Sequence, residues 1–217
     1  MDSINIHDRD AGQYDRQAEA WGWNPEIFFG LMWEYVNLED RLLDVGIGTG
    51  LCSKPFVKAG VGIHGFDASE EMLGLCKAKH VADDLKVHDV EDVPWPYPEA
   101  CFDHIIAGGV FHFFGSLKAI FKEIVRLLAK EGVFGFNISM FTREEWTHRG
   151  LPPCEPYAKV LDEASGARIY KHSESYIQSL LEENGMSVEK KLTFLASLNP
   201  QTLEEHYSTL FVARQRR

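Results

Sequence analysis

Short apolar runs alternate with amphipathic stretches over the first two thirds of the chain. In "LKAIFKEIVRLL" the apolar residues recur at every third or fourth position, which predicts a helix over Leu117–Leu128. Strands and helices in succession imply parallel strands joined by right-handed crossovers, and therefore an α/β fold. The predicted strands are Arg41–Val45, Gly62–Phe66, Leu85–His88, Phe102–Ala107 and Val133–Ile138, and the other helices between them are Gly50–Ala59 and Ser69–Lys79.

The two ends of the chain differ from this alternating centre. Helical stretches over Ala11–Ala20 and Pro25–Asn37 precede the first strand, and a helix over Glu174–Asn184 follows the fifth. The last two stretches, "MSVEKKLTFLA" and "EEHYSTLFVAR", alternate between apolar and polar residues as the strands of an antiparallel hairpin do. We therefore expect one domain, residues 1–217, with a doubly wound, mostly parallel seven-stranded sheet and an antiparallel C-terminal edge hairpin.

Residues 139–171 interrupt the alternation. This segment contains three prolines and two glycines and follows neither the helical nor the strand period. A loop-rich stretch of this length in a compact domain is usually functional or disordered. We interpret it as a variable insertion.

Composition argues against several classes of partner and site. The chain has 22 Lys and Arg against 33 Asp and Glu, a net charge of −11, which argues against a nucleic-acid partner. The longest nearly uncharged apolar stretch, Ile105–Phe114, is much shorter than a membrane span, and the first residues lack the features of a secretory signal. The four cysteines have neither the spacing of a zinc site nor that of a disulfide framework. We predict a cytoplasmic protein that needs no metal or membrane, and the oligomeric state stays open.

The stretch "LLDVGIGTG" places three glycines at every second position, directly after a predicted buried strand. Gly46 and Gly48 let the backbone turn closely around a ligand, and Gly50 allows the next helix to pack closely. Amides at the start of that helix would face the ligand. A strand, a glycine turn and a helix in this order predict a ligand site at the carboxyl edge of the sheet.

The ligand class depends on the glycine spacing and on a second acid. Asp67 ends the second strand, where an acid accepts hydrogen bonds from both ribose hydroxyls of an adenosine. Dinucleotide binders place their third glycine three residues after the second, but Gly50 follows Gly48 by two. This G-x-G-x-G spacing, with Asp44 before the first glycine, resembles the signature of class I S-adenosylmethionine-dependent methyltransferases.

The resemblance extends from Tyr14 to Ile138 and includes the closing "RLLAKEGVFGF". It implies a Rossmann-like methyltransferase fold, S-adenosylmethionine as cofactor and S-adenosylhomocysteine as product. Asp89 would accept from the adenine amino group, and Val90 would offer its amide to the ring. Ala68 and Met72 would pack on the adenine, although Met72 is equally explained as helix core. The implied cofactor-binding residues are Tyr14, Asp44, Gly46, Gly48, Gly50, Asp67, Ala68, Met72, Asp89, Val90 and Gly108.

The N-terminal "YDRQAEAWGW" resembles the lid of the ubiquinone- and menaquinone-biosynthesis type of small-molecule methyltransferases. The resemblance makes residues 1–40 a helical lid and residues 139–171 an insertion on the substrate side. Tyr14 would contact the methionine end of the cofactor. Trp21 and Trp23 would either face the substrate or pin the lid to the body, and the second interpretation is favoured.

The candidate catalytic residue is His112, in "GGVFHFFG" after the fourth strand. In the resembled family this segment faces the methyl group, and Gly108 and Gly109 leave room there. Histidine titrates near neutrality and can accept a proton from an acceptor, but His112 among apolar neighbours is equally explained as a packing residue. The segment lacks the Asn/Asp-Pro-Pro-aromatic stretch of exocyclic-amine methyltransferases. It also lacks the cysteine needed for cytosine C5 methylation.

Aromatic residues gather in the segments that would cover the site, namely Phe111, Phe113, Phe114, Phe141, Trp146 and Tyr157. Such a lining suits a flat or apolar small molecule. We expect methyl transfer from S-adenosylmethionine to an O, N or C atom of a small apolar or aromatic molecule. A non-catalytic S-adenosylmethionine-binding module is the alternative, and a nicotinamide-dependent oxidoreductase is a further one.

Overall fold

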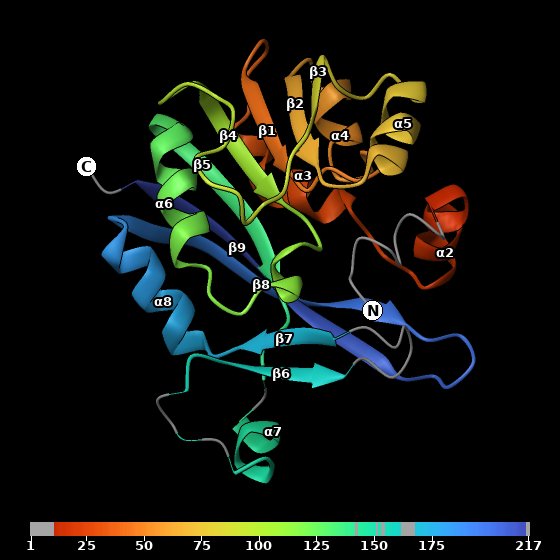
Figure 1. Cartoon of the computed structure of the whole chain (residues 1–217), viewed down its shortest axis with the longest axis vertical. Helices are drawn as coiled ribbons and strands as arrows, with labels where there is room; N and C mark the ends of the chain where they lie inside the picture. Colours follow the sequence, from red (N-terminus) through yellow and green to blue (C-terminus); the bar gives the residue numbers. More distant parts are fainter. Residues whose placement is uncertain (1–10, 142, 151, 153–154, 162–167, 216–217) are drawn as a thin grey trace.

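A seven-stranded sheet forms the centre of the protein (Figure 1). The structure is a computed structural model that describes residues 11–141, 143–150, 152, 155–161 and 168–215. Within these residues the strand order is β3-β2-β1-β4-β5-β9-β8, with β9 antiparallel to β5 and β8 and the other neighbours parallel. The predicted fold class is therefore confirmed. The strands are β1 (Arg41–Val45), β2 (Gly62–Asp67), β3 (Asp84–Val87), β4 (Phe102–Ala107), β5 (Leu128–Ile138), β8 (Met186–Leu198) and β9 (Glu205–Gln215).

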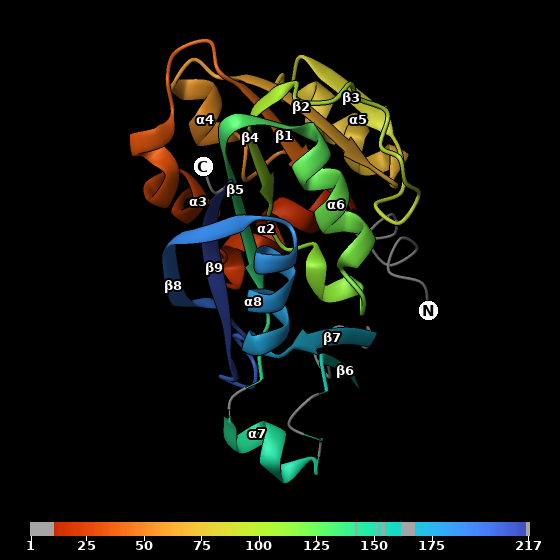
Figure 2. The same ribbon diagram turned by 90° about the vertical axis from the view of Figure 1, so that its left-hand side faces the viewer.

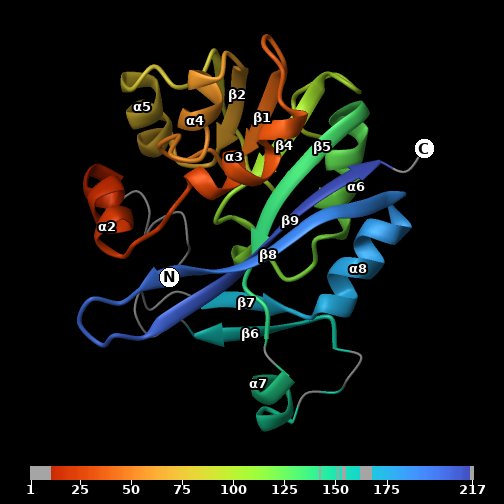
Figure 3. The same cartoon turned by 180° about the vertical axis from the view of Figure 1, so that it is seen from behind.

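Helices cover both faces of the sheet (Figures 2 and 3). On one face lie α3 (Glu26–Met32), α4 (Lys54–Lys58) and α5 (Glu70–Ala78), and on the other lie α6 (Lys118–Leu127) and α8 (Glu174–Glu183). The central strands are buried on both faces by these helices, as their continuous apolar runs predict. Other helical pieces are η1 (Ala11–Gln13), α2 (Tyr14–Ala20), η2 (Trp33–Tyr35), η3 (Phe111–Phe113) and α7 (Arg143–His148).

The helix after the glycine turn is shorter than predicted. We expected Gly50–Ala59, but α4 begins only at Lys54. Gly46, Gly48 and Gly50 all have positive φ angles, so the chain stays in turns before it can enter the helix. By contrast, Ser69 caps α5 as its sequence position predicts, accepting a hydrogen bond from the Met72 amide at 3.1 Å.

The segment at residues 139–171 is more regular than its sequence pattern predicts. It contains α7 (Arg143–His148) and an antiparallel pair formed by β6 (Tyr157–Leu161) and β7 (Arg168–His172). Each strand is only five residues long and neither is continuously apolar, so the sequence carries little strand signal. Packing against the loop after β4 helps to hold them: a Cβ built at Gly115 would lie 2.6 Å from Tyr157 Cε2.

The carboxyl ends of β1 to β5 point toward α2, the β6–β7 hairpin and the turn that joins β8 to β9 (Figures 1 and 3). The strand order reverses between β1 and β4. Ligands of open α/β sheets bind outside the carboxyl edge at such a reversal. Among the described residues, no helix has the length and apolar character needed to cross a bilayer.

Candidate active site

The glycine turn after β1 adopts the conformation that its composition predicts. Gly46, Gly48 and Gly50 have φ angles of 64°, 52° and 84°, a region that side chains disfavour. A Cβ at Gly46 would lie 2.7 Å from Val110 Cγ2, so this glycine also serves close packing. At Gly48 the nearest atom would be Met72 Cε at 3.4 Å, an ordinary contact. Gly48 is therefore required for its backbone conformation and not because neighbouring atoms crowd it.

Asp67 connects the end of β2 to the glycine turn. Its Oδ2 accepts a hydrogen bond from the Gly48 amide and its Oδ1 accepts one from the Ser69 amide, both at 2.9 Å. The carboxylate is half-buried and fixed between the turn and the start of α5. Ala68 follows it, and the buried Met72 lies one turn into α5. The structure thus brings Gly48, Asp67 and Met72 together, an arrangement that fits the adenosine part of a cofactor.

Asp44 lies at the other side of this turn. It is buried, and its carboxylate accepts a hydrogen bond from Ser53 Oγ at 2.7 Å. Burial raises the pKa of Asp44 to about 7; the Ser53 hydrogen bond acts against this shift and the Asp67 carboxylate acts with it. The hydrogen bond between the buried Asp44 and Ser53 therefore braces the glycine turn on its protein side.

Three residues join the predicted lid to the glycine turn. Thr49 Oγ1 donates to Asp15 Oδ1 at 2.5 Å, and Lys79 pairs with the same carboxylate and donates to the Thr49 carbonyl at 3.1 Å. Burial acts to raise the pKa of Asp15, but the hydrogen bonds from Lys79 and Thr49 outweigh it and leave that pKa below its ordinary value. We call Asp15, Thr49 and Lys79 the lid latch. Sequence analysis missed it because the partners are far apart along the chain.

Tyr14 lies at the start of α2, beside the latch. Burial raises its pKa well above the ordinary tyrosine value, and the nearby Cys52 and Asp67 act in the same direction. The phenol therefore stays protonated and can donate a hydrogen bond. The other end of the predicted lid is attached to the β8–β9 hairpin: the Leu198 amide donates to the Trp21 carbonyl at 2.8 Å, and the Trp23 and Phe194 ring centroids lie 6.2 Å apart. These contacts support the interpretation that this end pins the lid.

The predicted adenine contacts lie on the loop between β3 and β4. Asp89 is exposed, and its Oδ1 accepts a hydrogen bond from the Glu91 amide at 2.9 Å. Val90 is buried, and its carbonyl accepts a hydrogen bond from Trp95 Nε1 at 3.0 Å. Both residues thus lie at the carboxyl edge, beyond the strand that neighbours β2.

A buried polar network fixes the loop after β4. The Gly109 amide donates to Asn137 Oδ1 at 2.7 Å, Asn137 Nδ2 donates to Ser208 Oγ at 2.8 Å, and Ser208 donates to the Ile138 carbonyl at 2.9 Å. Gly108 is tightly enclosed, since a Cβ there would lie 2.5 Å from Cys52 Sγ. Sequence analysis missed Asn137, although a polar residue inside the apolar "VFGFNI" was a usable signal.

His112 lies on η3, directly after this network, and is half-buried. Its neighbour Phe111 is fully buried among the phenylalanines of α6 and β5. Three residues further on, the Gly115 carbonyl accepts a hydrogen bond from His172 Nε2 at 3.1 Å. Contacts on both sides therefore fix the segment that carries His112. Of the predicted aromatic cover, the side chain of Trp146 lies outside the described residues.

Comparison with known proteins identifies the central part of the chain. Residues 43–136 match the family described as "Methyltransferase domain". The match covers less than half of the chain. The matched residues contain the glycine turn, Asp67, the loop with Asp89 and Val90, and the segment with His112, whereas Tyr14 lies outside the match. The match confirms the methyltransferase resemblance of this region.

Curated relatives carry several methyltransferase names. A malonyl-[acyl-carrier protein] O-methyltransferase of Pectobacterium atrosepticum is 32% identical over 128 residues, which is 59% of this chain and 49% of that protein. A ubiquinone biosynthesis O-methyltransferase of Pelagibacter ubique is 29% identical over 94 residues, which is 43% of this chain and 39% of that protein. The chain spans about half the length, or less, of these relatives.

Solved structures share the fold over a longer part of the chain. An S-adenosylmethionine-dependent methyltransferase of Methanosarcina mazei superposes with a TM-score of 0.68 at 16% identity, covering 85% of this chain and 96% of that one. Magnesium protoporphyrin IX methyltransferase of Synechocystis, solved with bound S-adenosylhomocysteine, gives a TM-score of 0.61 at 19% identity, covering 100% and 89%. Because the sequence identities are below 20%, these superpositions show a shared fold only.

Proposed function

We propose that this protein transfers the methyl group of S-adenosylmethionine to an O, N or C atom of a small apolar or aromatic molecule. The observation that carries the proposal is the contact of Asp67 with the Gly48 amide, within the matched domain. It fixes an acid at the strand end where adenosine-binding folds recognise ribose. Relatives named for ubiquinone biosynthesis and for sterol C-methylation support small acceptors as a class.

In this proposal the chain's own residues bind the cofactor, orient the acceptor and exclude water from the site. Bound S-adenosylmethionine would supply a methyl group on a sulfonium, and an acceptor atom attacking the methyl carbon in line would release S-adenosylhomocysteine. Asp67 and the glycine turn hold the adenosine. Tyr14 covers the methionine end when the lid latch holds α2 against the glycine turn. Positioning and exclusion of water account for much of such a reaction's rate. Where the acceptor carries a proton, His112 removes it as the new bond to the methyl carbon forms.

The acceptor would enter from the side of the β6–β7 hairpin. Tyr157 and Tyr170 of that hairpin approach Gly115, next to the segment with His112, at 2.6 and 3.0 Å from a Cβ built there. Their rings meet edge to face with centroids 5.8 Å apart. Aromatic walls of this kind suit flat or apolar molecules. A reducing compartment such as the cytoplasm is part of the proposal, supported by the spacing of the cysteines.

Labelled S-adenosylmethionine and a panel of phenols, carboxylates, amines and activated carbon acids test this function. We expect acceptor-dependent formation of S-adenosylhomocysteine together with a methylated product. Tight binding of S-adenosylhomocysteine without product from any acceptor class would favour the non-catalytic module. Binding of NAD in place of S-adenosylhomocysteine would contradict the proposal.

A further inference from the structure

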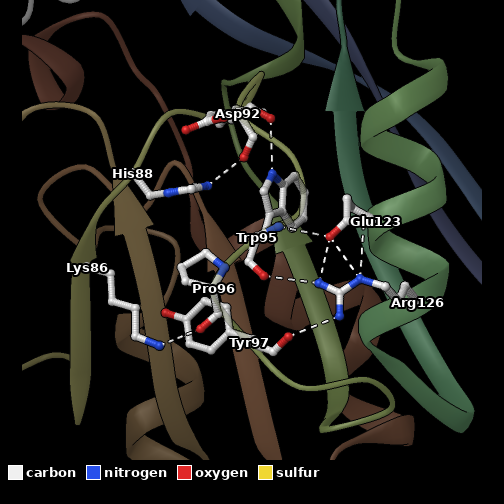
Figure 4. Close-up of polar contacts among 9 residues, drawn as sticks. Lys86, His88, Asp92, Trp95, Pro96, Tyr97, Glu123 and Arg126 are labelled. Atoms are coloured by element: carbon white, nitrogen blue, oxygen red, sulfur yellow. Dashed lines mark hydrogen bonds and ion pairs between the residues drawn. The ribbon is translucent and has the colours of Figure 1, made fainter.

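A polar pair on α6, Glu123 and Arg126, holds the loop between β3 and β4 (Figure 4). Arg126 donates to two loop carbonyls, from Nη2 to Trp95 at 3.1 Å and from Nη1 to Tyr97 at 3.0 Å. Glu123 accepts from the Trp95 amide at 3.0 Å and from Arg126 Nη2 at 2.7 Å. Two side chains one helical turn apart therefore fix three backbone groups of the loop.

Trp95 carries this restraint to the predicted adenine contacts. This residue is 2% exposed, and its ring packs against that of Phe66 with centroids 5.0 Å apart. Its Nε1 donates to the Val90 carbonyl at 3.0 Å, and Val90 directly follows Asp89. A continuous path of hydrogen bonds thus runs from α6 through Trp95 to the residues expected to meet the adenine.

The pair stays charged although it is largely buried. Burial acts to raise the pKa of Glu123, but hydrogen bonds from Arg126 and the Trp95 amide outweigh it and keep that pKa below its ordinary value. A buried ion pair often contributes little net stability compared with apolar residues of similar size. Its directional bonds to three loop groups instead select one loop conformation.

We propose that Glu123 and Arg126 are positioning residues that set the base selectivity of the cofactor site. Through Trp95 they hold Asp89 and Val90 in place against the adenine ring. This inference rests on the proposed function. Asp89 would accept from the 6-amino group of adenine, whereas the carbonyl oxygen of hypoxanthine at that position would repel the carboxylate. Correct placement of Asp89 should therefore appear as a preference for adenine.

Calorimetric titration with S-adenosylhomocysteine and S-inosylhomocysteine tests this inference. The wild type should prefer the adenine compound by about tenfold or more, as expected for a hydrogen bond to a charged group. Glu123→Gln, Arg126→Lys and Trp95→Phe should reduce the preference to within about threefold. Arg214→Lys is the matched control, because Arg214 also binds a glutamate and a backbone carbonyl, those of Glu131. It should keep the wild-type preference.

Circular dichroism melting identifies the variants that fold, and the ratio of the two affinities separates positioning from general loss of stability. Folded variants with the wild-type preference would overturn the inference and leave the proposed function intact. A wild type that binds both compounds equally would also overturn it. A wild type that binds neither would refute the proposed function, and the inference with it.

Discussion

Asn137 at the end of β5 accepts a hydrogen bond from the backbone amide of Gly109, 2.7 Å away, in the loop that follows β4. Gly109 has a φ angle of 74°, so the chain turns sharply there on its way to His112. Because Asn137 also donates to Ser208, both ends of its amide group are satisfied. The bond therefore links the candidate catalytic segment to two strands of the sheet.

Asn137→Ala should lower both stability and turnover. The half-buried Gly109 amide and the buried Ser208 hydroxyl would lose a partner, at a cost of about 1–3 kcal/mol in the free energy of unfolding for a buried unsatisfied group. Turnover should fall while S-adenosylhomocysteine affinity stays near the wild-type value. Urea denaturation and steady-state kinetics measure these effects, and Ser208→Ala, which keeps the bond to Gly109, is the control. Equal turnover in Asn137→Ala and the wild type would contradict the role.

Thr49→Val should release the lid while leaving the glycine turn folded. Valine has the shape of threonine but cannot donate to Asp15, and a hydrogen bond to a charged group contributes about 1.5–3 kcal/mol. Hydrogen exchange of the α2 amides should accelerate and S-adenosylhomocysteine should bind more weakly. Ser187→Ala removes a hydroxyl on β8, remote from the lid, and should change neither. Unchanged exchange in Thr49→Val would show that the latch does not hold α2.

His172 makes stability depend on pH. It is fully buried, and burial lowers its pKa to about 4, whereas an unfolded histidine titrates near 6.5. Below pH 6.5 the unfolded chain takes up a proton that the folded chain refuses, so stability falls as pH drops from about 6.5 to 4, by about 3 kcal/mol in total. His172→Gln should flatten this part of the profile. Urea unfolding at several pH values measures it, and parallel profiles for both proteins would refute the assignment.

The two interpretations of His112 predict different results for His112→Ala. A general base contributes about 10²–10⁴-fold to the rate, so turnover should fall by that factor while cofactor affinity stays nearly constant. A packing residue would instead lower the melting temperature and leave the turnover of the folded fraction almost intact. Melting temperature and single-turnover rate, measured on the same variant, decide between the two.

The sequence predicts the helices and strands whose buried residues recur in a regular pattern along the chain. β1 and β4 have the bounds expected for them, because strands covered on both faces are continuously apolar. Contacts between residues far apart in the sequence leave no such regular pattern. Asp15 and Lys79 are 64 positions apart, and Gly109 and Asn137 are 28 apart. The β6–β7 hairpin was missed because packing against its neighbours, more than its own pattern, stabilises it.

Titration calorimetry of S-adenosylhomocysteine on the wild type, Asp67→Ala and Asp84→Ala tests the central claim most directly. The wild type should bind at one site, and Asp67→Ala should bind about 10- to 150-fold more weakly, as loss of hydrogen bonds to a charged group predicts. Asp84→Ala removes a carboxylate that pairs with Lys86 on β3 and should bind like the wild type. A wild type that does not bind, or a folded Asp67→Ala with wild-type affinity, would contradict the account.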